Sequence, residues 1–217
     1  MTDDSRTRTL TRIAASLGRD SSAAASAATA SYAQIARDYR SPNRKNGRAI
    51  DDVFIERLHE YDAVCTRVAA LSDLPTAIAA TLASRSMATL AFVSGIPAEW
   101  LPKEWSFQAA ESLSVHELDR VPGILTGCTV AIAETGSIVL QSGRRQGQRR
   151  HTLIPDFHLC VVLKSQLVAS VPQAFPRLLP DLPTTFISGP SATADIEMTR
   201  IRGVHGPRTL QVLLVAD

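Results

Sequence analysis

Apolar residues recur every three or four positions in several stretches of the chain, and this spacing predicts amphipathic helices. Residues 7–17 form one such stretch, which ends before Gly18, a residue type that often terminates a helix. The longest stretch covers residues 51–71, where Asp51 or Asp52 is placed to cap a helix. The apolar face of that predicted helix carries Phe54, Leu58, Tyr61, Cys65 and Val68.

Two further helices and four strands complete the pattern. Helices are predicted over residues 75–84, where Pro75 suits a first turn, and over residues 166–179, before Pro180. Short strands are predicted at residues 89–93, 159–163, 185–188 and 209–215. The apolar run at 89–93 is typical of a parallel strand covered on both faces, and the run at 159–163 is typical of another buried strand. Because helices and strands alternate, the chain is predicted to be α/β, with a mostly parallel open sheet flanked by helices.

The segment from Cys128 to Pro155 departs from this alternation and predicts a β-hairpin inserted into the sheet. β-branched residues between Ile132 and Leu140 favour one strand, and a polar loop with four arginines leads back to a partner strand at residues 151–154. A glycine inside a strand marks a bulge or a close approach of another backbone, and Gly136 has that place. Glu134 would then lie on irregular backbone within the hairpin.

The first 48 residues are predicted to be an N-terminal helical and flexible segment, and residues 49–217 a single domain. Residues 21–31 are almost entirely Ala, Ser and Thr, which bury too little apolar surface to hold a helix in place. We expect them to be a mobile connector. Residues 40–48 are basic and rich in turn formers, which favours an exposed loop.

Composition and charge exclude several classes of function. The formal net charge is +2 over 217 residues, and the basic loop has no interleaved aromatic residues, so no nucleic-acid partner is expected. The three cysteines are far apart, which predicts neither a disulfide framework nor a metal site. No apolar run approaches the ~20 residues that span a bilayer, and the expected location is the cytoplasm.

Three segments carry residues suited to binding a small anion. Ligands of open α/β sheets bind beyond the carboxyl ends of strands, where each of these segments is predicted to lie. The turn with Gly189, Ser191 and Thr193 precedes a predicted helix with Asp195 and Glu197, and it offers free N–H groups or an ordinary helix cap. The other two segments are the turn around His205 and the basic loop.

His205 lies between two glycines, and it is either a solvated turn residue or a binding or proton-transfer group. The basic loop holds Arg144, Arg145, Arg149 and Arg150, whose guanidinium groups suit a carboxylate or a phosphate. Arg149 and Arg150 adjoin the predicted return strand and are the better ligand candidates, while Arg144 and Arg145 fit a solvated surface. We expect Arg149 or Arg150, the 189–193 turn and His205 to meet in one pocket at the carboxyl edge of the sheet.

Two blocks of this sequence resemble the LUD-domain family, in particular its lactate utilisation protein C branch. The first runs from ELDRVPGILTGCTVAIAETGSIVL through the arginine loop to TLIPDFHLCVVL, and the second is FISGPSATADIEMTRIRGVHGPRTLQVLLV. They cover about half of the chain in the family's order. The resemblance implies a fold similar to ribose-phosphate isomerase, glucosamine-phosphate deaminase and the CoA transferases.

The same resemblance implies an accessory subunit of a system that oxidises L-lactate to pyruvate, working beside iron–sulfur partner proteins. The chain has no cluster-binding cysteine run and no dinucleotide-binding glycine motif, so no cofactor is expected on this chain alone. The alternative is a free-standing enzyme acting on a sugar phosphate or an acyl-CoA. In that case Glu134 would be a nucleophile, by likeness to the CoA transferases, and His205 is the other catalytic candidate.

Overall fold

The computed structural model describes residues 3–18, 29–36, 47–194, 200–203 and 205–217. By internal contacts the chain divides into two units, Met1–Ser41 and Pro42–Asp217. In the first unit helix α1 spans Asp3–Ser16, which confirms the first predicted helix, and residues 29–34 are helical. The connector predicted at 21–31 and the loop predicted at 40–48 lie mostly outside the described residues.

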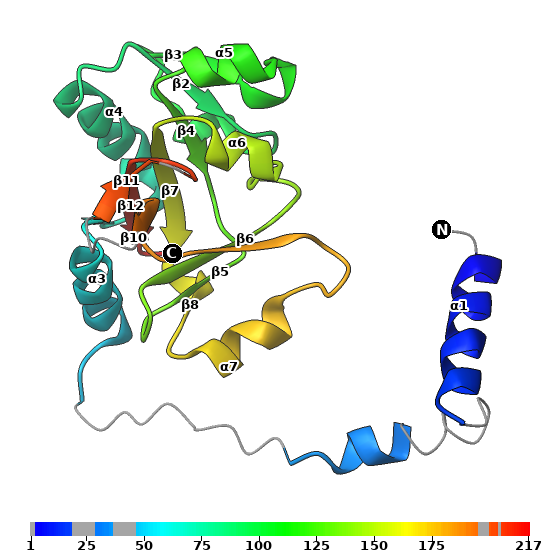
Figure 1. The fold of residues 1–217 in the computed structure, drawn as a ribbon. Helices are drawn as coiled ribbons and strands as arrows, with labels where there is room; N and C mark the ends of the chain where they lie inside the picture. The colour runs from blue at the N-terminus through cyan, green and yellow to red at the C-terminus, as the bar shows by residue number, and fades with distance from the viewer. Residues whose placement is uncertain (1–2, 19–28, 37–46, 195–199, 204) are drawn as a thin grey trace. The chain divides into compact units, whose positions relative to one another are not determined.

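A six-stranded parallel sheet is the centre of the second unit (Figure 1). Its order is β1 (Val64–Val68), β12 (Thr209–Val215), β7 (Phe157–Leu163), β4 (Gly123–Thr126), β2 (Thr89–Phe92) and β3 (Ser106–Ala109). Every neighbouring pair in it is parallel. The predicted parallel sheet is therefore confirmed, and the longest strands, β7 and β12, lie side by side near its middle.

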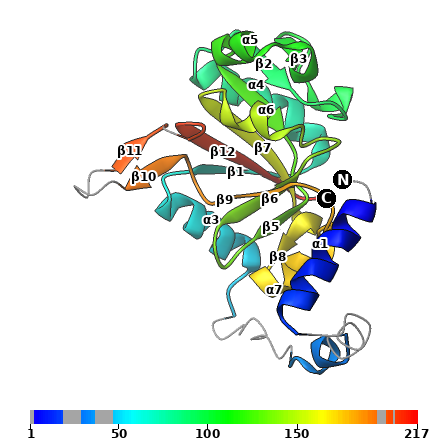
Figure 2. The ribbon, with the colours of Figure 1, turned by 45° about the vertical axis from the view of Figure 1, so that its right-hand side comes forward.

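Alternate residues of β12 enter two different hydrophobic clusters, because successive side chains of a strand point to opposite faces. Leu213 packs with Leu74, Ile78 and Leu82 of helix α4 (Leu74–Ser84). Val212 and Leu214 pack with Phe54 and Leu58 of helix α3 (Ile50–Glu60). Each face of the sheet is thus covered by a helix, as Figures 1 and 2 show, and the helix predicted over residues 75–84 is confirmed.

A second, mixed sheet of four strands packs on the α3 side of the main sheet (Figure 2). Its order is β8 (Leu167–Val168), β5 (Val130–Ile132), β6 (Ser137–Gln141) and β9 (Thr184–Ile187). Helix α7 (Val171–Ala174) covers its other face through Ala174. Strands β10 (Ala192–Ala194) and β11 (Arg200–Arg202) form a separate antiparallel pair.

Short helical segments connect these elements. Helix α5 (Val115–Arg120) begins with Ser114 and Glu117 in a reciprocal capping arrangement, and helix α6 (Arg149–Leu153) precedes β7. Five 3-10 turns lie at Leu71–Asp73, Ala98–Trp100, Ala110–Ser112, Lys164–Gln166 and Phe175–Arg177. Within the described residues, no helix is long and apolar enough to cross a membrane.

The helix predicted over residues 51–71 is wrong in its second half. Helix α3 ends at Glu60, Asp62 takes a left-handed backbone conformation with φ of 62°, and residues 64–68 form strand β1. Cys65 and Val68 matched the helical spacing, but β-branched residues around them suit a strand, and pairing with β12 decides the outcome. Tertiary pairing therefore overrides the local pattern here.

The predicted hairpin exists, but its second strand is not the one predicted. Its two strands are β5 and β6, joined by a turn at residues 133–136, whereas residues 149–153 form helix α6 rather than a return strand. Gly136 lies in that turn with φ of 60°, and a Cβ added there would lie 2.8 Å from Cβ of Arg57. The close backbone approach predicted for Gly136 is real, although it occurs at the turn and not inside a strand.

The helix predicted over residues 166–179 is also wrong, and the helix predicted to contain Asp195 and Glu197 lies outside the described residues. Residues 166–179 form β8, α7 and a 3-10 turn, because Pro172 and Pro176 each lack the N–H that a continuous helix needs and each fits the first turn of a new one. Residues 192–194 form strand β10 paired with β11.

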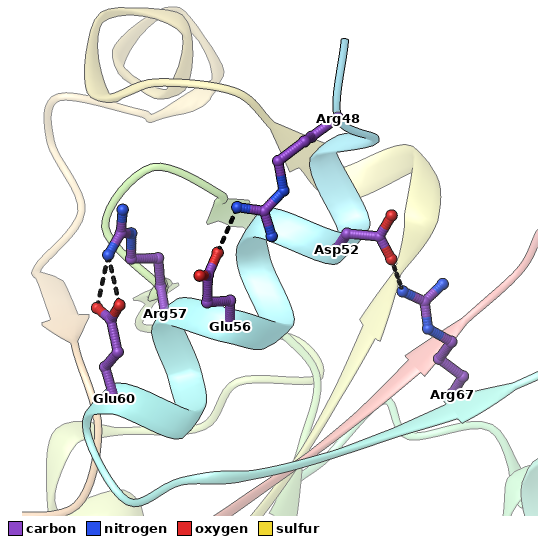
Figure 3. A network of polar contacts seen from close by, with 6 residues as sticks. All are labelled: Arg48, Asp52, Glu56, Arg57, Glu60 and Arg67. Atoms are coloured by element: carbon purple, nitrogen blue, oxygen red, sulfur yellow. Dashed lines mark hydrogen bonds and ion pairs between the residues drawn. The ribbon is translucent and has the colours of Figure 1, made fainter. Parts of the chain in front are cut away.

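The outer surface of α3 carries ion pairs, which Figure 3 shows. Arg57 binds Glu60 one turn further along, and Arg48 binds Glu56 with a distance of 2.7 Å between Nη1 and Oε2. Arg67 reaches from β1 to Asp52 of this helix. Exposed pairs of this kind contribute about 0–1 kcal/mol each, so the apolar face of α3 fixes it to the sheet far more than its charges do.

Candidate functional site

A cavity of about 310 Å³ lies where three segments of the second unit meet. Its lining comes from α6, from β9 and the turn after it, from the loop before β12, and from the first residues of strands β7 and β12. The lining residues are Arg149, Thr152, Leu153, His158, those at 185–192, those at 205–207, and Leu210. The volume is within the range of about 300–1,000 Å³ that is usual for small-molecule sites.

The cavity lies toward the amino ends of β7 and β12, because His158 and Leu210 are the second residues of those strands. We expected the cavity at the carboxyl edge of the main sheet, and that prediction is wrong. His205 precedes β12 instead of following a strand, and α6 precedes β7. Only the 189–192 part of the lining follows a carboxyl end, that of β9 in the second sheet.

Ser191 ties the turn after β9 to the loop before β12 through three hydrogen bonds. Its N–H donates to the carbonyl oxygen of Pro207 (2.8 Å), and its own carbonyl oxygen accepts from the N–H of Gly203 (2.9 Å). Its hydroxyl oxygen accepts from the N–H of His205 (3.2 Å). A cap for a following helix is excluded, since a strand follows, and Ser191 instead holds the His205 loop against the turn.

Gly189 is placed by close packing rather than by an anion. It has φ of 89°, and a Cβ added there would lie 2.5 Å from Cβ of Tyr61, at the end of α3. Only glycine fits this position without a shift of backbone. The adjoining Ser188 is anchored to the second sheet, with 2.6 Å between its Oγ and Oγ of Ser137.

The four arginines of the basic loop separate into different environments. Arg149 is exposed and lines the cavity from the start of α6. The backbone of Arg145 bridges the carboxyl ends of β2 and β4, since its N–H donates to Ser94 (2.7 Å) and its carbonyl oxygen accepts from Gly127 (2.6 Å). Arg144 also lies there, with its side chain against Gly95.

Arg150 does not line the cavity, although it neighbours Arg149 in sequence. Its Nε lies 3.2 Å from Nε2 of His151, a buried side chain whose Nδ1 accepts from the N–H of Gln148 at the start of α6. Thr193 lies within β10, and the position of its side chain lies outside what the structure describes. Of the proposed ligand-binding residues, the structure therefore brings together Arg149, Gly189, Ser191 and His205.

Glu134 is exposed in the turn between β5 and β6 and does not line the cavity. Among the described residues that do line it, none is Asp or Glu. The nearest acidic side chain in sequence, Asp156, lies 3.6 Å from Arg208, outside the lining. The wall thus offers a guanidinium, hydroxyl groups and an imidazole without a carboxylate to neutralise them, which suits an anion.

His158 is a cavity residue that the sequence reasoning missed. It is 1% exposed, and its Nε2 lies 2.7 Å from Oγ1 of Thr126 in the neighbouring strand. Burial lowers its pKa to about 4, so the ring is neutral at physiological pH. The available signal was a single histidine within the otherwise apolar strand FHLCVVL.

The cysteines do not form a metal centre with neighbouring side chains. Burial raises the pKa of Cys65 to about 12, and contact with Cys160 together with burial raises the pKa of Cys128. Within the ranges that the structure covers, no group of three or more His, Cys, Asp or Glu side chains is arranged to hold a metal ion.

A family model described as the LUD domain matches residues 55–215 of this chain. The chain belongs to the LUD-domain family. The match contains both sequence blocks and every lining residue of the cavity, so the resemblance drawn from those blocks is confirmed. The cavity is therefore a feature of the LUD domain itself and not of the N-terminal unit.

Relatives of this LUD domain carry the name lactate utilization protein C. The protein of that name from Deinococcus radiodurans is 44% identical over 167 residues, which cover 75% of this chain and 77% of the relative. Those from Halalkalibacterium halodurans and Bacillus subtilis are 34% and 31% identical, and the match spans about half of their length (52% and 53%).

A solved structure shares the fold of this LUD domain. It is the crystal structure of a DUF162 family protein from Deinococcus radiodurans, with a TM-score of 0.66 and 40% sequence identity. The likeness covers 76% of this chain and 96% of that one. The main sheet, its flanking helices and the second sheet are accordingly the architecture of a LUD domain.

Proposed function

We propose that this LUD-domain chain serves a lactate utilisation system as an accessory subunit for the oxidation of L-lactate to pyruvate. The names of its relatives support this assignment, most directly the Deinococcus radiodurans protein at 44% identity. Iron–sulfur partner proteins carry the electrons in this proposal, and the reaction takes place in the cytoplasm. The chain contributes assembly, a binding site for a small anion, or both.

The cavity is the observation that carries the ligand part of the proposal. Arg149, the turn with Gly189 and Ser191, and His205 come from positions up to 56 residues apart in sequence and yet line one space. Among the described residues, none of them has an acidic neighbour in that lining. A small carboxylate or phosphate would accept hydrogen bonds from the guanidinium of Arg149 and from polar groups of the wall.

The strength expected of such a site is modest. A hydrogen bond to a charged group contributes about 1.5–3 kcal/mol, and Arg149 is exposed, so water competes for its guanidinium. Two or three contacts of this kind correspond to a dissociation constant of about millimolar. That value suits a metabolite that is present at high concentration.

Titration of the purified chain with L-lactate, pyruvate and inorganic phosphate tests the site. Arg149→Gln should weaken binding about tenfold or more, whereas Arg144→Gln should leave it unchanged, because Arg144 lies at the carboxyl ends of β2 and β4. Both side chains are exposed, so the two variants should melt at the same temperature as the wild type. Equal losses from both substitutions would mean that the cavity is not the binding site.

Co-purification from lactate-grown cells tests the accessory role. The tagged chain should bring down proteins with the visible absorbance of iron–sulfur clusters. The chain purified alone is the control, and it should be colourless because its three cysteines cannot supply four ligands to a cluster. A lone chain that carries a stoichiometric metal, or a pull-down without iron–sulfur proteins, would contradict the proposal.

The alternative is a free-standing enzyme that acts on a sugar phosphate or an acyl-CoA, argued from likeness to the isomerases, deaminases and CoA transferases. It requires Glu134, Arg149 and His205 to converge. Glu134 lies in the exposed turn between β5 and β6 and not in the cavity lining, so this alternative lacks its nucleophile at the site. Turnover of an acyl-CoA that is lost in Glu134→Gln would favour it.

A further inference from the structure

One polar side chain that lines the cavity has an unused hydrogen-bonding atom. His158 is 1% exposed and lines the cavity, and its Nδ1 has no hydrogen-bond partner among the residues that the structure describes. A buried polar atom left without a partner costs about 1–3 kcal/mol, and such atoms are rare in native proteins. This unpaired nitrogen belongs to a side chain that lines the cavity, so it is a group that a ligand atom would satisfy.

The contact between His158 and Thr126 indicates which ring nitrogen carries the proton. If Nε2 carried it, the ring would donate to Oγ1 of Thr126, and both the hydroxyl hydrogen of Thr126 and the lone pair of Nδ1 would lack partners. If Nδ1 carries it, the hydroxyl of Thr126 donates to Nε2, and only one group, the Nδ1–H, is left unpaired. The second tautomer leaves fewer buried groups unsatisfied, so Nδ1 is a donor.

We propose that His158 is a specificity-determining residue of the cavity, whose Nδ1–H donates to an acceptor oxygen of the bound anion. This inference rests on the proposed function, since it takes the cavity to be the anion site. A neutral donor suits this buried position because it adds a hydrogen bond without placing a second charge where water cannot reach. Arg149, which is exposed, supplies the charge, and the buried His158 contacts an oxygen of the same ligand.

Two amide substitutions separate the two ring nitrogens. The side-chain nitrogen of asparagine lies the same number of bonds from the backbone as Nδ1, and that of glutamine the same number as Nε2. His158→Asn therefore keeps a donor at the place of Nδ1 and loses the contact with Thr126. His158→Gln keeps a partner for Thr126 and loses the donor at the place of Nδ1. Both keep a polar group of similar size within the strand.

Titration with pyruvate and, separately, with inorganic phosphate should distinguish the pair. We expect His158→Gln to weaken binding about tenfold and His158→Asn to remain within about threefold of the wild type. The comparison of pyruvate with inorganic phosphate shows whether the oxygen that His158 contacts belongs to a carboxylic acid or to a phosphate. Equal affinities of the Asn and Gln variants, with binding by the wild type intact, would overturn the role of His158 alone.

A measurement on the wild type covers the case in which a variant does not fold. In ¹⁵N NMR spectra of the free chain, His158 should show a protonated Nδ1 and an unprotonated Nε2, and addition of the bound probe should shift the Nδ1 signal. A protonated Nε2 in the free chain, or an Nδ1 signal that the probe leaves unchanged, would overturn the inference. If the wild type binds none of the probes, the proposed anion site fails, and the role of His158 fails with it.

Discussion

The main sheet and the cavity wall are built on different principles, although they share strands β7 and β12. In the sheet, Leu159 and its neighbours are wholly buried, and their stability comes from many interchangeable apolar contacts. In the wall, Gly189 and Ser191 hold their places through one close approach and three hydrogen bonds. The sheet therefore tolerates variation that keeps volume, and the wall depends on individual atoms.

A substitution in the sheet should have the largest effect on stability. Leu159→Ala removes a fully buried side chain of β7 and should lower the free energy of unfolding by about 2–5 kcal/mol. Phe186→Ala in β9 is the control, because this cavity residue is 47% exposed and should cost less than about 1 kcal/mol. Urea unfolding of both variants measures the difference. Similar losses would remove the contrast between the two regions.

The next effect is the pH dependence of stability that comes from His158, a titratable residue of β7 that also lines the cavity. Burial lowers the pKa of His158 to about 4 from its ordinary 6.5, so the unfolded chain binds the proton first. The stabilising contribution is fully present above pH 6.5 and is lost as the pH falls toward 4, with a magnitude of about 3 kcal/mol. Wild type should therefore lose more stability than His158→Gln between pH 7 and pH 4.

His151 provides a check on that comparison. Burial also lowers its pKa, and it is present in both proteins, so its contribution cancels in the difference. Urea unfolding at several pH values gives the two curves. Parallel curves for wild type and His158→Gln would mean that His158 is not neutral in the folded chain.

The smallest effect should come from the wall. Ser191→Ala removes the hydroxyl that accepts from the N–H of His205 and should cost about 1 kcal/mol, with faster amide exchange at His205. Ser112→Ala is the control, because its hydroxyl donates to the carbonyl of Ala109 on the exposed surface and not at the cavity. Unchanged exchange at His205 would show that the loop holds its place without Ser191.

Strands and helices with unambiguous local patterns were predictable. The apolar runs at 89–93, 159–163 and 209–215 became β2, β7 and β12, since runs this short and this apolar have few stable places other than a buried sheet. The errors fell where two patterns compete. Cys65 and Val68 fitted a helical stripe, and pairing with β12 made them a strand.

The cavity residues were predictable by type and less so by position. Local chemistry singled out Arg149, Gly189, Ser191 and His205, all of which line one cavity. It also proposed Arg150, which does not line it, because the helix α6 turns neighbouring side chains in different directions. Sequence neighbours share a composition but not an orientation.

The sequence by itself determined the α/β class, the central strands and the family, because burial of apolar runs and family motifs are properties of contiguous residues. Only the tertiary structure decided that the cavity lies at the amino ends of β7 and β12 and that Arg144 and Arg149 lie in different places. Only it placed His158 beside Thr126, 32 positions away. Such distances depend on the order in which strands pair, and pairing is set by the packing of the whole sheet rather than by any one segment.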